Sequence, residues 1–260
     1  MHRFLSDTKK YKSYILYSTK AKLKAELAGS HFGWIWWILD PLMSMLIYMF
    51  VFTVVFKRNT TYVTAFIFLG ISLWKFFNTT VTGSVTLVKQ NRHTISKVYL
   101  PKFTLVVINM LCNGVKLAFA MVIVVILMGY YQIPLSVSML QIIPVLLLLF
   151  LLTFGLSCLF MHAGVYFEDL ANFIRISFQL LFYASGVFYP IMDALGAELA
   201  RIMLWCNPVA LVLNEARGAL LYATGCNWLA LGMWFVISIL LSVWGVYLIY
   251  RNENQYVKMV

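Results

Sequence analysis

Long apolar runs separated by short polar stretches make up most of this 260-residue chain. Six of these runs approach the length needed to cross the ~30 Å hydrocarbon layer of a membrane as helices rising 1.5 Å per residue. They cover residues 38–56, 62–80, 103–130, 140–163, 171–189 and 228–250. The pattern predicts an all-α integral membrane protein, with residues 1–260 forming a single domain of six transmembrane helices.

The segment before the first run, residues 1–33, is polar and basic. Leu16, Leu23 and Leu27 can share one helical face, which predicts an amphipathic helix over residues 13–29 lying on the inner membrane surface. A disordered basic tail is the alternative. The segment has no apolar core, so it does not match a cleaved signal peptide.

A second polar stretch, residues 88–102, separates the second and third runs; we call it the inner polar segment. Val88, Ile95, Val98 and Tyr99 recur in it at helical spacing, so we expect a short amphipathic helix ended by Pro101. Two interpretations follow. The segment is an ordinary polar connection, or it is a coupling helix by which a soluble partner moves the membrane domain.

Residues 190–227, before the last run, mix charged side chains with apolar stretches too short to span a bilayer. Asn207 followed by Pro208 is typical of a helix N-cap with proline at the first helical position. The pattern predicts two short helices, 194–205 and 208–222, that lie on or dip into the outer leaflet.

The composition excludes a soluble domain, because 62% of the residues are hydrophobic and only 11% are charged. Fourteen of the twenty Lys and Arg residues fall in the predicted inner segments and four in the outer ones, which places both termini in the cytoplasm. Lys75 and Lys116 lie within spans and must face protein or water. The net charge of +11 is then explained by contact with anionic lipid head groups rather than by binding of nucleic acid.

Enzyme and metal chemistry find little support in the sequence. The histidines are isolated, so no metal site is expected, and a disulfide between Cys206 and Cys226 is left open. The adjacent Glu168 and Asp169 would point in different directions on a helix, so they do not form a catalytic pair. The chain has no phosphate-binding G-x-x-x-x-G-K-[ST] loop and is not expected to hydrolyse ATP by itself.

Aromatic residues gather at two places. Trp34, Trp36 and Trp37 mark a membrane interface, and Phe178, Phe182 and Tyr189 lie close to one helical face of the fifth span. Aromatic faces suit sugar rings, and basic groups at the inner interface suit an anionic head group, while lipid-facing bulk is the alternative for the fifth span.

The chain resembles the membrane subunits of ABC-2 type exporters of lipid-linked polysaccharides, which serve O-antigen, teichoic acid and capsule export. The resemblance covers nearly the whole chain and rests on Gly33-Trp34-Ile35-Trp36 with Pro41, Trp74-Lys75-Phe76-Phe77, Lys97-Val98-Tyr99-Leu100-Pro101-Lys102, Glu168-Asp169-Leu170, Ser185-Gly186-Val187-Phe188-Tyr189-Pro190, and Asn207-Pro208 with Arg217. Glu168 departs from the family pattern, which often has Arg there.

The resemblance implies a homodimer in the cytoplasmic membrane of a bacterium, with two copies of an ATP-binding subunit that bind ATP and Mg. No cofactor is expected on this chain. The implied substrate path includes Trp34, Trp36, Trp37, Phe178, Phe182, Tyr183 and Tyr189; head-group candidates are Lys22, Lys24 and Arg175. Coupling to the ATPase is assigned to Arg92, Ile95, Lys97, Val98, Tyr99, Glu168 and Asp169, and an outer gate to residues 190–227 with Asn207, Pro208, Glu215 and Arg217.

Three alternatives stay open. The nearest is an exporter of drugs or small lipids from the same superfamily. An intramembrane lipid-modifying enzyme would need clustered Asp, Glu or His at the ends of spans, and only Glu168 and Asp169 come near. A secondary transporter would show inverted repeats and broken helices, which are not visible.

Overall fold

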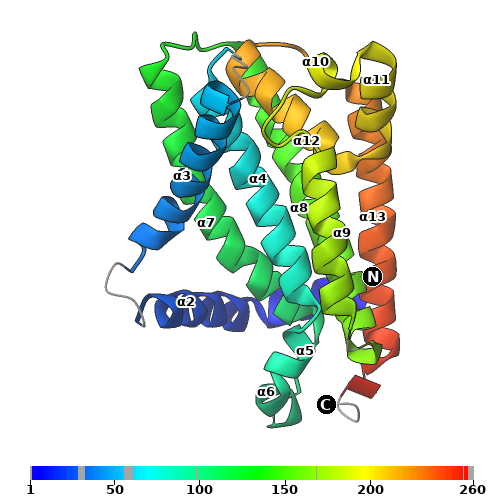
Figure 1. Cartoon of the computed structure of the whole chain (residues 1–260). Helices are drawn as coiled ribbons and strands as arrows, with labels where there is room; N and C mark the ends of the chain where they lie inside the picture. Colours follow the sequence, from blue (N-terminus) through cyan, green and yellow to red (C-terminus); the bar gives the residue numbers. More distant parts are fainter. Residues whose placement is uncertain are drawn as a thin grey trace.

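The computed structural model describes residues 2–28, 33–55, 61–97, 99–167, 169–253 and 255–256, and within these ranges the regular structure is entirely helical. In this described part of the chain, four helices are long and apolar enough to cross a membrane: α4 (Val63–Ser84), α7 (Phe103–Tyr130), α8 (Ile142–Tyr166, entered through the 3₁₀ turn η2, Val137–Gln141) and α13 (Trp228–Arg251). Two shorter apolar helices, α3 (Ile35–Met49) and α9 (Leu170–Ala184), run beside them (Figure 1).

The predicted ends of the spans agree with the structure to different degrees. The third span, residues 103–130, coincides with α7. The first starts earlier than predicted, since α3 begins at Ile35 and continues through the π-helical turn η1 (Phe50–Val55). The fifth ends at Ala184 rather than at residue 189, because Gly186 adopts a φ of +64° and turns the chain. The 15 residues of α9 rise about 22 Å, less than a bilayer core, so the six-span count remains a prediction.

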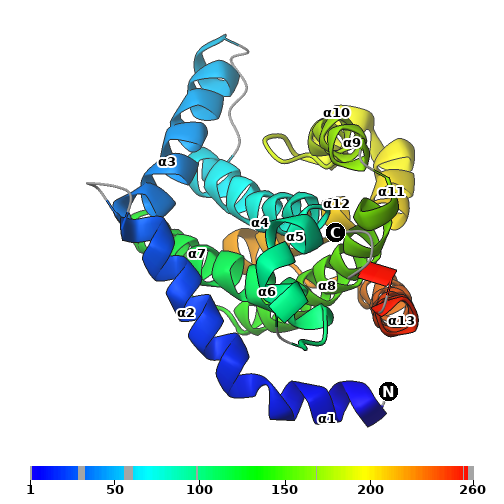
Figure 2. The same cartoon turned by 90° about the horizontal axis from the view of Figure 1, so that it is seen from below.

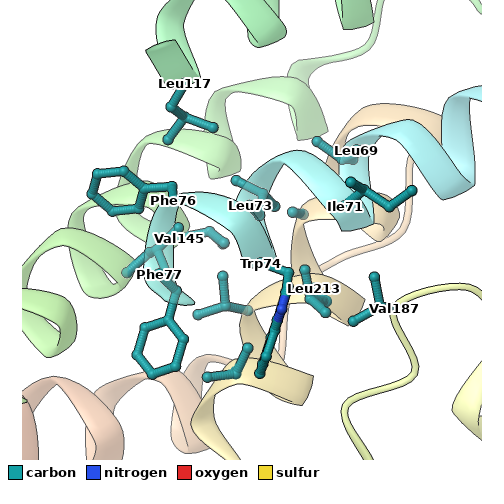
Figure 3. Close-up of a cluster of buried hydrophobic side chains, with 14 of the residues drawn as sticks. Leu69, Ile71, Leu73, Trp74, Phe76, Phe77, Leu117, Val145, Val187 and Leu213 are labelled. Atoms are coloured by element: carbon teal, nitrogen blue, oxygen red, sulfur yellow. The ribbon is translucent and has the colours of Figure 1, made fainter. Parts of the chain in front are cut away.

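Helix α4 lies at the centre of the bundle. Its side chains are buried on nearly every side, and Figure 3 shows Leu69, Leu73, Trp74 and Phe77 packed against residues from α7, α8 and α12 (Pro208–Arg217). Its apolar residues are distributed around the helix, and such a helix needs neighbours on several sides. The arrangement makes α4 the common wall of the two largest hollows described below, one on the side of α9 and one on the side of α3 and α7.

Helices α8 and α13 pack closely because small residues face one another. A Cβ atom at Gly155 would lie 2.9 Å from the backbone nitrogen of Ser242, and one at Gly245 would lie 2.7 Å from Cβ of Cys158. Small residues at such contacts let membrane helices approach with few voids.

The N-terminal region forms two helices, α1 (His2–Lys10) and α2 (Lys12–Ala28), which lie across one end of the bundle (Figures 1 and 2). A helix therefore covers residues 13–28 of the predicted range, but its apolar side chains are spread around it, so the predicted amphipathic character is not seen; α1 was not foreseen. In α2, Ile15 and Thr19 are buried against the bundle. Leu16 is exposed, so it does not lie on the buried face with Leu23 and Leu27 as expected.

The inner polar segment contains two short helices instead of one. These are α5 (Leu87–Gln90) and α6 (Arg92–Lys97), with the break at Asn91, whose side chain donates a hydrogen bond to the Leu87 carbonyl (2.8 Å). Figure 1 shows both helices projecting beyond the level of α2, at the same end of the bundle as α1 and the C-terminal end of α13. We call this the inner end.

The opposite, outer end carries four short helical pieces: α10 (Ile191–Leu195), α11 (Ala197–Cys206), α12 and the π-helical turn η3 (Gly218–Tyr222). The predicted pair of helices therefore corresponds to α11 and to α12 with η3, and α10 is additional. Cys206 and Cys226 are not joined by a disulfide.

Candidate functional site

A groove of about 530 Å³ lies between α4 and α9, in the half of the bundle nearer the inner end. Its lining combines aromatic rings, amides, hydroxyls and one cation: Trp74, Asn78, Thr82, Gly83, Thr86, Ala171, Arg175, Phe178, Gln179 and Phe182. Three residues predicted from sequence, Arg175, Phe178 and Phe182, therefore share one site. We call it the α4–α9 groove.

Aromatic rings continue from this groove toward the outer end in an unbroken series, which we call the aromatic column. Phe77 stacks on Phe178 with centroids 5.4 Å apart, and Trp74 lies 5.4 Å from Phe182. From Phe182 the series reaches Phe188 (5.4 Å), and it ends in the rings around it: Tyr48, Tyr183 and Tyr189. Most of these rings belong to the bundle core: Phe77, Trp74, Phe178 and Phe188 are at most 8% exposed. The half-buried Phe182 and Tyr189 and the exposed Tyr183 keep part of their rings open, and such ring faces can bind the C–H surfaces of sugars.

Arg175 gives the groove its charge. It lies on the exposed side of α9, about one helical turn from Phe178, so both side chains reach the same region. None of the described residues that line the groove is acidic. A guanidinium beside amide and hydroxyl groups can bind a phosphate through paired hydrogen bonds.

The other two head-group candidates lie elsewhere. Lys22 of α2 is half-buried, donates a hydrogen bond to Asn109 Oδ1 (3.4 Å) and lines a separate hollow of about 410 Å³ between α2, α5 and α7. Lys24 is exposed on α2. The structure therefore does not bring Lys22, Lys24 and Arg175 together within one chain.

The tryptophans at the start of α3 lie on another face of α4. Trp34 and Trp37 pack against Phe119 of α7, with ring centroids 6.4 and 6.0 Å apart. Trp36 and Trp37 line a cavity of about 690 Å³ bounded by α2, α3, α4 and α7. The aromatic residues predicted to form one path are thus divided between two sites in the single chain.

The residues assigned to ATPase coupling have different surroundings. Arg92 and Lys97 are exposed on α6, as is Asp169 at the start of α9. Ile95 is only 6% exposed and packs into the chain's own core, so it holds α6 in place instead of facing a partner. Val98 and Glu168 lie outside the described residues. The surface that α6 presents is polar and basic.

Tyr99 takes part in a polar network that sequence reasoning missed. Its hydroxyl accepts a hydrogen bond from Arg3 (2.7 Å) and donates one to Glu253 (3.1 Å), and Arg3 also contacts Glu253 at 3.1 Å. Buried Lys102 lies 3.9 Å from the same carboxylate; burial lowers the pKa of Lys102, and Glu253 opposes that shift. The network ties α1, the inner polar segment and the end of α13 together, and no local pattern could have paired residues 250 positions apart.

At the outer end, Asn207 and Glu215 bind backbone and neighbouring side chains. Asn207 caps α12 by accepting hydrogen bonds from the Val209 and Ala210 amides (3.0 and 3.2 Å), next to Pro208, and it donates one to Ser185 Oγ (2.9 Å). Glu215 accepts a hydrogen bond from the Asn227 amide (3.1 Å). Both residues hold the connections around α12.

Among the described cations of the outer end, Arg217 is the most buried, at 4% exposure. It donates hydrogen bonds to the carbonyls of Gly186 (2.8 Å), Val187 and Phe66 (3.3 Å), and its guanidinium carbon lies 3.5 Å from the Phe66 ring centroid. These contacts fasten the turn after α9 to α4 and α12. An opening motion of this region would have to break them.

Known proteins resemble this chain over most of its length. A sequence model described as "ABC-2 type transporter" matches residues 15–221. The chain is 31% identical over 220 residues, 83% of each chain, to "O-antigen export system permease protein RfbA" of Myxococcus xanthus. It is 24% identical over 243 residues, 93% of each chain, to a Klebsiella pneumoniae protein of the same name, and 27% identical over 220 residues to a second one from that organism, covering 80% of this chain and 84% of the relative.

Proposed function

Because this chain belongs to the ABC-2 type transporter family, we propose that it is the permease subunit of an ABC exporter that moves a lipid-linked polysaccharide across the bacterial cytoplasmic membrane. Its relatives' names favour the O-antigen type of glycan, with teichoic acid export as the related case. The ATP and Mg are bound by a separate subunit, because this chain has no phosphate-binding loop.

The observation that carries the proposal is the continuity between the α4–α9 groove and the aromatic column. Arg175 would bind the diphosphate that links lipid to glycan, and Phe182, Tyr183 and Tyr189 would offer successive sugars stacking surfaces on the way outward. Contacts of this kind are individually weak, so a polymer can move from one ring to the next. Phe178 is only 8% exposed and stacks on Phe77, so it would support the wall of the groove.

The complete path would require a second copy of the chain. In a homodimer with six spans per subunit and both termini cytoplasmic, α3 and α9 of the two subunits would face a shared passage. Trp34, which is exposed at the start of α3 and does not line the cavity bounded by α2, α3, α4 and α7, would then join the aromatic residues of the partner's α9. The outer helices, fastened by Asn207, Glu215 and Arg217, would close the passage.

An exporter of drugs or small lipids is the second candidate of the same family. Such substrates favour pockets that are mostly apolar with few polar groups. The α4–α9 groove has a cation, two amides and two threonine hydroxyls among its lining residues, which suits a hydroxyl-rich, anionic substrate better.

The coupling role of α6 gives the test of the proposal. We expect Arg92→Glu and Lys97→Glu, each alone, to weaken binding of the ATP-binding subunit by about tenfold, because a reversed charge at an interface rim meets its partner with the wrong sign. The measurement is co-purification of that subunit with the tagged chain, together with the surface polysaccharide of cells whose own copy has been deleted.

Arg201→Glu on α11 is the matched control, because Arg201 is an exposed helical cation at the opposite end. It should leave co-purification unchanged. If both α6 variants retain the subunit and normal surface polysaccharide, α6 is an ordinary connection. If cells without the chain display normal polysaccharide, the export function itself is wrong.

A further inference from the structure

The cavity between α2, α3, α4 and α7 is separate from the α4–α9 groove. It uses a different face of α4, on which Ser72, Lys75 and Thr79 lie, and Figure 2 shows α2, α3 and α7 on the side of α4 away from α9. Its volume of about 690 Å³ falls within the range of small-molecule sites. The exported polymer, as proposed above, does not use it.

Among the described residues, four charged side chains line this cavity, and they form two ion pairs. Lys75 of α4 pairs with Asp40 of α3, and Lys116 of α7 pairs with Glu26 of α2, with Nζ and Oε2 2.7 Å apart. The lysines lie inside apolar helices, where a lone charge is costly, and each carboxylate comes from a neighbouring helix. The two pairs together make the charged lining electrically neutral.

The two ion pairs neutralise the lysines, but they do not explain why open space remains beside them. Both pairs are partly exposed, and the space beside them is also lined by the polar residues Ser72, Thr79 and Asn113 and by apolar Leu117 and Ala120. One part of the cavity can therefore bind a charged group and another part a hydrocarbon chain. Such a combination fits an amphiphile.

The charge balance decides which amphiphile fits. A dianionic diphosphate would meet two carboxylates as well as two lysines, so little net attraction would remain. A head group with one phosphate and one ammonium can place its phosphate between Lys75 and Lys116 and its ammonium between Asp40 and Glu26. The tryptophan rings at the cavity add an aromatic face for the ammonium. The ring of Trp37 already contacts one ammonium in this way, since Lys116 Nζ lies 5.7 Å from the ring centroid.

We infer that this cavity binds a zwitterionic membrane phospholipid with a primary ammonium, of the phosphatidylethanolamine type, taken from the inner leaflet. Helix α2 at the inner end and Trp36 and Trp37 at the start of α3 place the cavity near the head-group level. The bound lipid would fill the space between α2 and α3 and hold both helices against α4 and α7. The inference does not depend on which substrate the chain exports.

Native mass spectrometry of the full-length chain in detergent, with added lipids, tests the inference. The chain should bind phosphatidylethanolamine at least about tenfold more tightly than phosphatidylglycerol, which lacks the ammonium, and more tightly than phosphatidylcholine, whose ammonium has no N–H donor. Glu26→Gln should weaken phosphatidylethanolamine binding by about tenfold and strengthen phosphatidylglycerol binding, because Lys116 loses its carboxylate.

Asp40→Asn is the second variant and should act in the same direction, so the test stands if one variant fails to fold. Glu198→Gln, an exposed acidic residue on α11, is the matched control and should change nothing. The inference is overturned if the chain binds phosphatidylglycerol or a polyprenyl diphosphate more tightly than phosphatidylethanolamine. It is also overturned if both acidic variants bind phosphatidylethanolamine as the original chain does.

Discussion

Replacing Arg217 with Met is expected to lower the thermal unfolding midpoint of the purified chain by about 10 °C or to abolish its folded yield. Arg217 is buried and donates to three backbone carbonyls, in the turn after α9 and in α4. Methionine would fill much of the space but leave these carbonyl acceptors without donors. Each unsatisfied group lowers the free energy of unfolding by about 1–3 kcal/mol. Detergent-solubilised protein can be followed by size-exclusion chromatography and by its unfolding midpoint.

Arg201→Met provides the control for this prediction. Arg201 is exposed on α11, so its loss should change the midpoint by little, as for most surface substitutions. Equal midpoints for Arg217→Met and the original chain would mean that the three hydrogen bonds do not hold the outer end together.

Replacing Arg175 with Gln should reduce polysaccharide export at least about tenfold while leaving the amount of folded protein unchanged. Arg175 lies on the exposed side of α9 and supplies the cation of the α4–α9 groove, so its loss removes a charge-assisted contact worth about 1.5–3 kcal/mol. Arg175→Lys should keep part of the activity, since the charge remains and the paired hydrogen bonds are lost. Surface polysaccharide per folded transporter is the quantity to measure.

The matched control is Arg251→Gln at the inner end of α13. Arg251 is also an exposed helical arginine, and it donates to Tyr247 rather than facing the groove. Full export by Arg175→Gln, or an equal loss in both variants, would show that Arg175 does not bind the substrate.

The fold was predictable wherever the chain carries its own boundary signals. Helix α7 begins just after Pro101 and ends at the Tyr-Tyr-Gln-Ile-Pro turn, so both of its ends could be placed from local sequence. The end of α9 could not, because Gly186 turns the chain where the Arg217 side chain, 31 residues away in sequence, binds its carbonyl. Tertiary contacts of this kind produce no periodic pattern in the sequence from which they could be predicted.

The site shows the same division between local and tertiary information. Spacing on α9 placed Phe178 and Phe182 close to one helical face, and both line the α4–α9 groove, although Phe178 is only 8% exposed; their role in the substrate path stays a prediction. The rings that complete the column, Trp74 and Tyr48, come from α4 and α3, and only the packed structure brings them to α9. Helical spacing grouped Ile95 with Val88 and Tyr99 in the inner polar segment; Val88 and Ile95 are buried in the chain's own core, whereas Tyr99 is 57% exposed. The assignment of Ile95 to ATPase coupling came from the resemblance and not from this spacing.

Site-specific photo-crosslinking in exporting cells tests the substrate path most directly. Gln179 is exposed on α9 within the α4–α9 groove, and a benzophenone side chain placed there would reach any molecule that passes. Leu240, 62% exposed on α13, is the control position on the outside of the bundle. We predict adducts carrying polysaccharide at position 179 and none at position 240. Polysaccharide adducts at 240 that equal or exceed those at 179 would contradict the proposed path along α9.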